Sequence, residues 1–170
     1  TARLLEGAGL RLCEGQYLNI TFQDKTNVSQ EAYMGMIGAK TAALISCACE
    51  IGALVGSNDA SLREAFAAFG QKLGLAFQIR DDIQDLWGSL KEPRPPSVDI
   101  THRKKTFPVV YALEKAPEHL KAKLVNLYRK RALTDEEVAQ RAKRPDPGLV
   151  PTDLATQRSD QRSAAPRAHV

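Results

Sequence analysis

The sequence predicts an all-α protein, and three observations support this fold class. Apolar residues recur at helical spacing along most of the chain. No stretch alternates apolar and polar residues for long enough to form a convincing strand. With 170 residues and 43% apolar content, the chain is long enough for one domain and too apolar for wholesale disorder.

The first third of the chain predicts two helices. Leucine and alanine recur at helical spacing over residues 2–18, and a loop is expected over residues 19–27. Ser29 is a residue type that caps helix N-termini, and helical spacing continues behind it to about Val55. The sequence GSND at residues 56–59 then ends the second helix and caps the next.

Four further helices are expected. The first covers residues 60–87, and a loop with three prolines and one glycine follows at residues 88–98. Helical spacing returns over residues 99–115 and again over residues 117–131, where a proline suits the first turn. The sequence TDEE at residues 134–137 is typical of a capping box and predicts a short last helix.

The end of the chain differs in composition. Residues 141–170 hold four of the nine prolines and no aromatic residue, and they supply +3 of the formal net charge of +4. We therefore expect a domain over residues 1–140 and a disordered tail over residues 141–170. The remaining charge is nearly balanced, so the composition does not predict nucleic-acid binding.

Other classes of protein are disfavoured. The longest apolar stretch, GAKTAALISCACEIGALVG, is broken by Lys40 and Glu50, so no membrane span is expected. Three cysteines without a CxxC pair, Cys13, Cys47 and Cys49, indicate neither a disulfide framework nor a zinc site. They fit a reduced, cytoplasmic setting. The chain begins inside a helical pattern, which is typical of a fragment of a longer protein.

The strongest chemical signal is FQIRDDIQDLWG at residues 77–88. On a helix, Asp81 and Asp85 lie on one face with Gln78 beside them. The same face continues towards the N-terminus of the helix with small or polar residues. Bulky residues lie elsewhere on the helix and are expected to pack: Phe66, Phe69, Leu73, Ile79 and Ile83. Clustered carboxylates repel one another unless a cation joins them, and oxygen ligands suit Mg²⁺. The alternative is a solvated acidic helix surface.

Two basic signals accompany the carboxylates. Lys40 interrupts an apolar stripe, so its side chain either extends to solvent or points into a cavity that holds an anion. Small residues around it favour close helix packing. Lys104 and Lys105 lie near an expected helix start, with Arg94 and Arg103 close by, where free backbone N–H groups favour an anion. The alternative is an ordinary basic loop.

Four motifs in register resemble the C-terminal half of the trans-isoprenyl (polyprenyl) diphosphate synthase family, over about residues 2–131. GQYLNI at 15–20 is similar to the family's GQ-x-x-D segment, and GAKTAAL at 38–44 resembles its Lys-Thr motif. FQIRDDIQD at 77–85 resembles the second aspartate-rich motif, DDxxD. DITHRKKTFPVVYAL at 99–113 is similar to the lysine and Thr-x-Pro segment that follows it.

The resemblance implies an isoprenoid-synthase helical bundle around a deep cavity. Members of the family condense an allylic diphosphate with isopentenyl diphosphate in a Mg²⁺-dependent reaction and release pyrophosphate. Family members also commonly form homodimers. The released pyrophosphate is a plausible base for the final proton, so His102 and His119 are expected to be surface residues.

By matching position, the resemblance assigns roles to individual residues. Asp81, Asp82 and Asp85 would bind Mg²⁺ bridged to the allylic diphosphate, with Asp81 as the leading direct ligand. Lys40 and Lys104 would contact that diphosphate.

Thr41 and Gln78 would lie near the reacting carbons and orient the intermediate. Arg94, which stands where the family carries lysine in a Gly-Lys-Pro loop, would keep the charge of a substrate-binding residue.

Two departures from the family pattern bear on function. Asn19 replaces the aspartate of the GQ-x-x-D segment, which is expected to weaken a structural interaction. The first aspartate-rich motif is absent from this sequence, so the chain alone is expected to have little or no synthase activity. Two alternatives stay open: another class I terpenoid enzyme such as a cyclase, and a non-catalytic regulatory subunit of a prenyl synthase.

Overall fold

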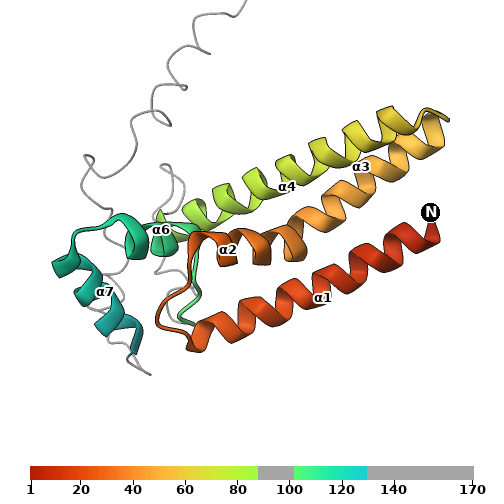
Figure 1. Ribbon diagram of the computed structural model, residues 1–170. Helices are drawn as coiled ribbons and strands as arrows, with labels where there is room; N and C mark the ends of the chain where they lie inside the picture. Colours follow the sequence, from red (N-terminus) through yellow and green to blue (C-terminus); the bar gives the residue numbers. More distant parts are fainter. Residues whose placement is uncertain (88–101, 130–170) are drawn as a thin grey trace, which may run out of the picture.

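In the computed structural model, residues 1–87 and 102–129 are described, and within these ranges every regular element is a helix (Figure 1). The all-α prediction is therefore confirmed for this part of the chain. The elements are α1 (Ala2–Asp24), α2 (Gln30–Ile37), the π-helical turn η1 (Gly38–Ala42), α3 (Ala43–Gly56), α4 (Ala60–Trp87), α6 (Phe107–Lys115) and α7 (Glu118–Arg129).

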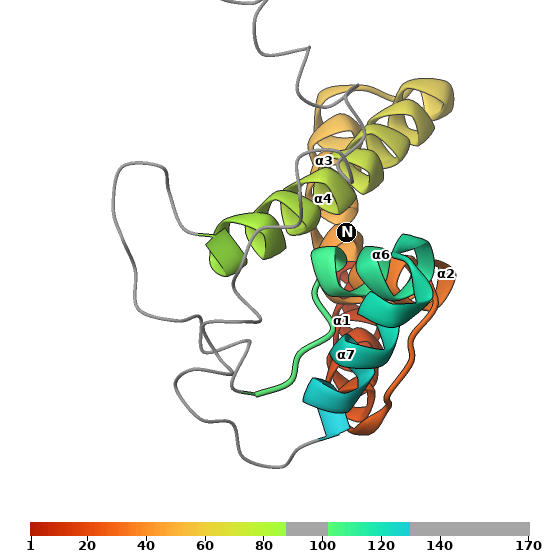
Figure 2. The ribbon, with the colours of Figure 1, turned by 90° about the vertical axis from the view of Figure 1, so that its left-hand side faces the viewer.

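The long helices lie side by side. Elements α2, η1 and α3 follow one another as a single bent rod, with α1 along one side and α4 along the other (Figures 1 and 2). The short helices α6 and α7 lie at one end of this arrangement, next to the C-terminal end of α1 and the start of α2. At that end, α6 contacts α2, α4 and α7.

Two polar caps define where helices begin. The Ser29 hydroxyl accepts a hydrogen bond from the Ala32 amide at 3.1 Å, which confirms the expected start of α2. Asp59 accepts hydrogen bonds from the Ser61 hydroxyl and amide, each at 2.8 Å. These hydrogen bonds hold the pKa of Asp59 below its usual value and begin α4 at the expected position.

The first helix is longer than the sequence predicts. The expected loop over residues 19–27 is wrong in its first part, because α1 continues to Asp24. Asn19 and Phe22 are buried in these added turns. The Thr21 hydroxyl donates a hydrogen bond to the Leu18 carbonyl at 3.0 Å. Tertiary packing here overrides the weak helix propensity of Ile20 and Thr21.

The helix expected over residues 99–115 starts later in the structure than the sequence predicts. Residues 102–106 are not helical, and α6 starts at Phe107 with Pro108 in its first turn. A helix that began at residue 99 would place Pro108 in its interior, where proline lacks the required N–H and clashes with the preceding turn. The helix over 117–131 is confirmed for its described residues, as α7.

The expectation that the bulky residues of α4 pack is confirmed for Ile79, which packs against the core around Tyr33, and is wrong for three others. Small residues make the closest contacts: a Cβ atom added to Gly74 would lie 2.5 Å from Cα of Ala42, and one added to Gly70 would lie 2.7 Å from Cα of Ser46. In contrast, Phe66, Phe69 and Leu73 are exposed. The glycines therefore let the backbones of α4 and the α2–η1–α3 rod approach closely, and the small-residue packing expected around Lys40 is confirmed.

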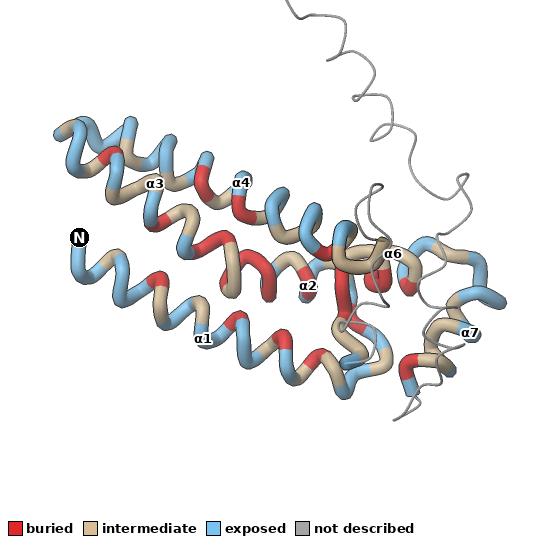
Figure 3. Tube along the Cα trace, turned by 180° about the vertical axis from the view of Figure 1, so that it is seen from behind, coloured by how far each residue is buried: buried red, intermediate tan, exposed pale blue. Residues whose placement is uncertain are grey.

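The large buried side chains form a core cluster that joins α1, α2 and α6. Figure 3 shows buried positions in each of these helices. This core cluster consists of Phe22, Val28, Tyr33, Met36, Ile37 and Val110. A smaller cluster of Val109, Leu113 and Tyr128 joins α6 to α7. The core therefore lies against the region that holds the carboxylates of α4.

One helical stretch among the described residues, Gln30–Gly56, is long and apolar enough to cross a bilayer by length and composition. Core helices of water-soluble proteins pass the same test, so the expected absence of a membrane span stays a prediction. The predicted loop over 88–98, the last helix at 134–137 and the tail over 141–170 lie outside the described residues.

Candidate active site

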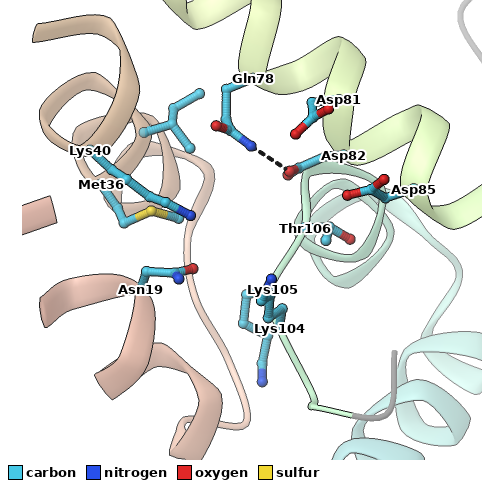
Figure 4. Close-up of a pocket in the computed structure, with 11 residues that line it drawn as sticks. Asn19, Met36, Lys40, Gln78, Asp81, Asp82, Asp85, Lys104, Lys105 and Thr106 are labelled. Atoms are coloured by element: carbon cyan, nitrogen blue, oxygen red, sulfur yellow. Dashed lines mark hydrogen bonds between the residues drawn. The ribbon is translucent and has the colours of Figure 1, made fainter. Parts of the chain in front are cut away.

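A pocket of about 290 Å³ opens at the core-rich end of the molecule (Figure 4). Its walls come from α1, α2, η1, α4 and the non-helical segment before α6. The lining residues are Asn19, Met36, Ile37, Lys40, Gln78, Asp81, Asp82, Asp85, Lys104, Lys105 and Thr106. Carboxylates on α4 thus share one pocket with lysines from two other parts of the chain.

Most of the residues that the sequence singled out meet here. Six line the pocket directly: Lys40, Gln78, Asp81, Asp82, Asp85 and Lys104. Thr41 joins them, because its hydroxyl donates a hydrogen bond to the Gln78 side-chain oxygen at 2.6 Å. Arg94 lies outside the described residues.

Lys40 belongs to the π-helical turn η1, and single π-helical turns inside α-helices are frequent at functional sites. Helix α1 passes close to this turn at Gly15, where an added Cβ atom would meet the backbone of Lys40. The Lys40 side chain extends into the pocket (Figure 4). Of the two readings of Lys40, the structure therefore supports a side chain that points into a cavity, and anion binding there stays a prediction.

The three carboxylates of α4 are not equivalent. Asp81 is exposed and Asp85 is half-buried, whereas Asp82 is only 6% exposed. The described residues contain no group of three or more His, Cys, Asp and Glu side chains that could hold a metal ion. The three carboxylates therefore do not form a metal site by themselves. A magnesium ion here would also need ligand oxygens from phosphate and water.

Asp82 is tied into a hydrogen-bond network. Its Oδ2 accepts hydrogen bonds from the Tyr33 hydroxyl at 2.6 Å and from the Phe107 amide at 2.7 Å. Its Oδ1 accepts one from the Gln78 side-chain nitrogen at 3.0 Å. Burial, followed by the nearby Asp82 carboxylate, raises the pKa of Tyr33 above its usual value, so Tyr33 is a neutral donor.

Tyr33 was not among the residues that the sequence singled out. It is completely buried and is the only tyrosine in the cluster of buried residues around α2. A signal was present, because Tyr33 lies seven residues before Lys40, which is two helical turns along one face. The sequence shows this alignment, but not the distant acceptor on α4.

The segment before α6 brings three polar side chains to the pocket: Lys104, Lys105 and Thr106. Lys105 is buried, and its ammonium group donates to the carbonyl oxygens of Gln23 and Arg103 at 3.4 and 3.0 Å. The Thr106 hydroxyl oxygen is buried without a hydrogen-bond partner among the described residues. Lys105 is therefore a buried, hydrogen-bonded lysine and not a surface one, and anion binding by this segment stays a prediction.

The two histidines in the described ranges, His102 and His119, are exposed. Neither lines the pocket. The expectation that both are surface residues is confirmed.

Solved structures define the class of fold. The chain superposes on a decaprenyl diphosphate synthase from Rhodobacter capsulatus with a TM-score of 0.73 and 28% sequence identity, covering 96% of this chain and 50% of that one. A polyprenyl synthase from Caulobacter crescentus, solved with calcium and isoprenyl diphosphate, gives 0.74 and 27%, covering 96% and 51%. The isoprenoid-synthase helical fold is thereby confirmed.

Sequence comparison identifies the family. The Polyprenyl synthetase family profile matches residues 1–144, and the chain belongs to that family. It is 39% identical over 119 residues to a short chain isoprenyl diphosphate synthase from Methanothermobacter thermautotrophicus, covering 69% of this chain and 37% of the relative. It is 35% identical over 141 residues to a (2E,6E)-farnesyl diphosphate synthase from Mycobacterium bovis, covering 81% and 39%. The chain thus spans well under half of these relatives.

Proposed function

We propose that this chain carries one side of the active site of a polyprenyl diphosphate synthase, a prenyltransferase. The reaction joins an allylic diphosphate to isopentenyl diphosphate and releases pyrophosphate. The observation that carries the proposal is the pocket in which carboxylates of α4 lie opposite Lys40 and Lys104. The names of the relatives, which are isoprenyl and farnesyl diphosphate synthases, support it.

The lysines provide the charge that the reaction requires. When the allylic C–O bond breaks, negative charge builds up on the leaving diphosphate, and the ammonium groups of Lys40 and Lys104 stabilise it in a partly enclosed pocket. Asp81 and Asp85 would hold Mg²⁺, which when bound neutralises further charge on the diphosphate. A solved relative that contains calcium and isoprenyl diphosphate is consistent with this chemistry.

The apolar wall and the polar pair have separate roles. Met36 and Ile37 line the pocket and exclude water from the side where the allyl group would lie. Thr41 and Gln78 hold each other through their hydrogen bond of 2.6 Å, so the Gln78 amide has a fixed orientation towards the reacting carbons. A carbocation formed here would therefore meet oriented dipoles rather than bulk water.

Pyrophosphate binding tests this proposal directly. In calorimetric titrations of the 170-residue chain, we expect pyrophosphate to bind only when Mg²⁺ is present. Asp81→Asn should weaken this binding by about tenfold or more, because it removes a charged oxygen ligand. Glu64→Gln neutralises an exposed carboxylate of the same helix outside the pocket and should leave the binding unchanged.

Two results would contradict the proposal. One is a chain that does not bind pyrophosphate with Mg²⁺, and the other is an equal loss in Asp81→Asn and Glu64→Gln. With isopentenyl and farnesyl diphosphates as substrates, we expect the chain alone to show little or no turnover. Homodimer formation and a cytoplasmic location stay predictions.

A further inference from the structure

The segment 102–106 forms one wall of the pocket without belonging to a helix. Its backbone includes Arg103 with a φ angle of 55°, a conformation that non-glycine residues rarely adopt. Regular hydrogen bonding does not fix this segment, so side chains from other elements must hold it. The position of Lys104 in the pocket depends on those side chains.

One group of contacts fixes the end of the segment that leads into α6. Both the Tyr33 hydroxyl of α2 and the Phe107 amide of α6 donate to Oδ2 of Asp82, at 2.6 and 2.7 Å. A single buried carboxylate thereby joins α2, α4 and the start of α6. The rings of Tyr33 and Phe107 also pack together, with centroids 5.9 Å apart.

A second group of contacts holds the middle of the segment. The Lys105 ammonium group donates to the Gln23 carbonyl of α1 and lies 4.4 Å from the centre of the Tyr128 ring of α7. The Tyr128 hydroxyl donates to the Lys104 carbonyl at 3.3 Å. Tyr33, Asp82, Lys105 and Tyr128 thus tie the segment to four helices.

We propose that Tyr33 and Asp82 are positioning residues that hold the 102–106 segment, and with it Lys104, at the pocket, and that Asp82 is not a magnesium ligand. This inference rests on the proposed function. It divides the DDxxD motif by role: Asp81 and Asp85 face the ligand, and Asp82 anchors the wall opposite Lys40.

The geometry of Asp82 supports this division. A carboxylate oxygen has two lone pairs, and Oδ2 of Asp82 already accepts two hydrogen bonds. A metal ion at this oxygen would have to displace the Tyr33 hydroxyl or the Phe107 amide. The displaced group would then lose its hydrogen bond in a buried site, which is costly. Asp81 is exposed at the pocket and faces no such cost.

Amide hydrogen exchange tests the anchoring role without any ligand. Tyr33→Phe removes only the hydroxyl, so the Asp82 carboxylate loses one of the hydrogen bonds that hold it in place. We expect the Phe107 amide, which donates to that carboxylate, to exchange about tenfold faster. Amides of α3 should keep their exchange rates. Tyr17→Phe is the matched control, since Tyr17 is exposed on α1, and it should change neither. If Phe107 exchange in Tyr33→Phe stays within about twofold of Tyr17→Phe, the anchoring role is wrong.

Titration separates positioning from metal binding. At saturating Mg²⁺, Tyr33→Phe should weaken pyrophosphate binding about fivefold by loosening the segment that carries Lys104, with the Mg²⁺ concentration for half-maximal binding unchanged. Asp82→Asn should leave that Mg²⁺ concentration unchanged, whereas Asp81→Asn should raise it. An equal increase in both aspartate variants would overturn the division of the motif. If the unmodified chain binds no pyrophosphate, the proposed function fails, and the exchange experiment alone decides the anchoring role.

Discussion

Two faces of α4 show opposite kinds of packing. On one face, Gly70 and Gly74 are buried against the backbones of α3 and η1. On another face, five large apolar side chains form a stripe that is exposed in the described part of the chain; Phe69, for example, is 58% exposed. This exposed stripe consists of Leu62, Phe66, Phe69, Leu73 and Phe77. The closest contacts of α4 with the neighbouring backbones are therefore made by its smallest residues.

The difference shows what sets the geometry of the pocket. Close backbone approach at Gly74 brings η1 against α4, and one turn further along, Thr41 reaches Gln78 with a hydrogen bond of 2.6 Å. Larger side chains at the glycine positions would separate the two helices by a distance that this hydrogen bond does not span. The exposed stripe contributes nothing to this spacing.

Of the substitutions that probe how α4 packs, the largest effect is expected from closing the gap at Gly74. In Gly74→Ala, the new Cβ would lie 2.5 Å from Cα of Ala42, so α4 must move away from η1. We expect urea denaturation to show a loss of about 2 kcal/mol in the free energy of unfolding, because overpacking outweighs the better helix propensity of alanine. The Thr41–Gln78 contact should weaken as well.

Gly52→Ala is the control for this substitution. Gly52 lies in α3, and an added Cβ there meets nothing within 4 Å. The same change should therefore stabilise the chain by about 0.5–1 kcal/mol through helix propensity alone. Equal effects of the two substitutions would show that the glycines of α4 are not needed for close approach.

The helical fold was largely predictable from the sequence, and the packing direction was not. Helical periodicity locates α4 correctly but wrongly marks Phe66, Phe69 and Leu73 as packed, since periodicity reports apolar faces and not what covers them. Pro108 carried the information that α6 starts late, because proline is tolerated only in a first turn. The first error concerns which surfaces meet, which depends on distant parts of the chain, whereas the second could have been avoided from the local sequence.

The candidate site was predictable where its residues lie in motifs. Lys40, Gln78 and Asp81 were all singled out, and the structure brings them to one pocket. Tyr33 was missed because its role depends on an acceptor 49 residues away, and local spacing carries no such information. Helical spacing sets Asp82 apart from Asp81 and Asp85, but its burial depends on the Tyr33 hydroxyl and the Phe107 amide, which only the folded chain brings to it.

A smaller effect is expected from the hydrogen bond across the glycine face. The Ser46 hydroxyl of α3 donates to the Ala67 carbonyl of α4 at 2.8 Å. Ser46→Ala removes this bond without adding volume, and we expect a loss of about 1 kcal/mol in urea denaturation. The control is Ser61→Ala, whose hydroxyl bonds only the exposed Asp59 near the start of α4 and should matter less. If Ser61→Ala lowers the free energy of unfolding more than Ser46→Ala, the hydrogen bond across the glycine face contributes less to stability than the exposed one at the start of α4, and the prediction is wrong.

The smallest effect is expected on the exposed stripe. Phe69→Ala removes a large ring that is mostly solvent-exposed, so the free energy of unfolding should change by less than about 0.5 kcal/mol. Phe22→Ala makes the same change at a buried position of the core cluster and should cost about 3–5 kcal/mol. Binding of an apolar fluorescent dye should fall in Phe69→Ala, because an exposed apolar surface has been removed. A cost for Phe69→Ala close to that of Phe22→Ala would mean that the stripe is covered in solution. Both faces of α4 would then be packed, and they would differ only in what covers them.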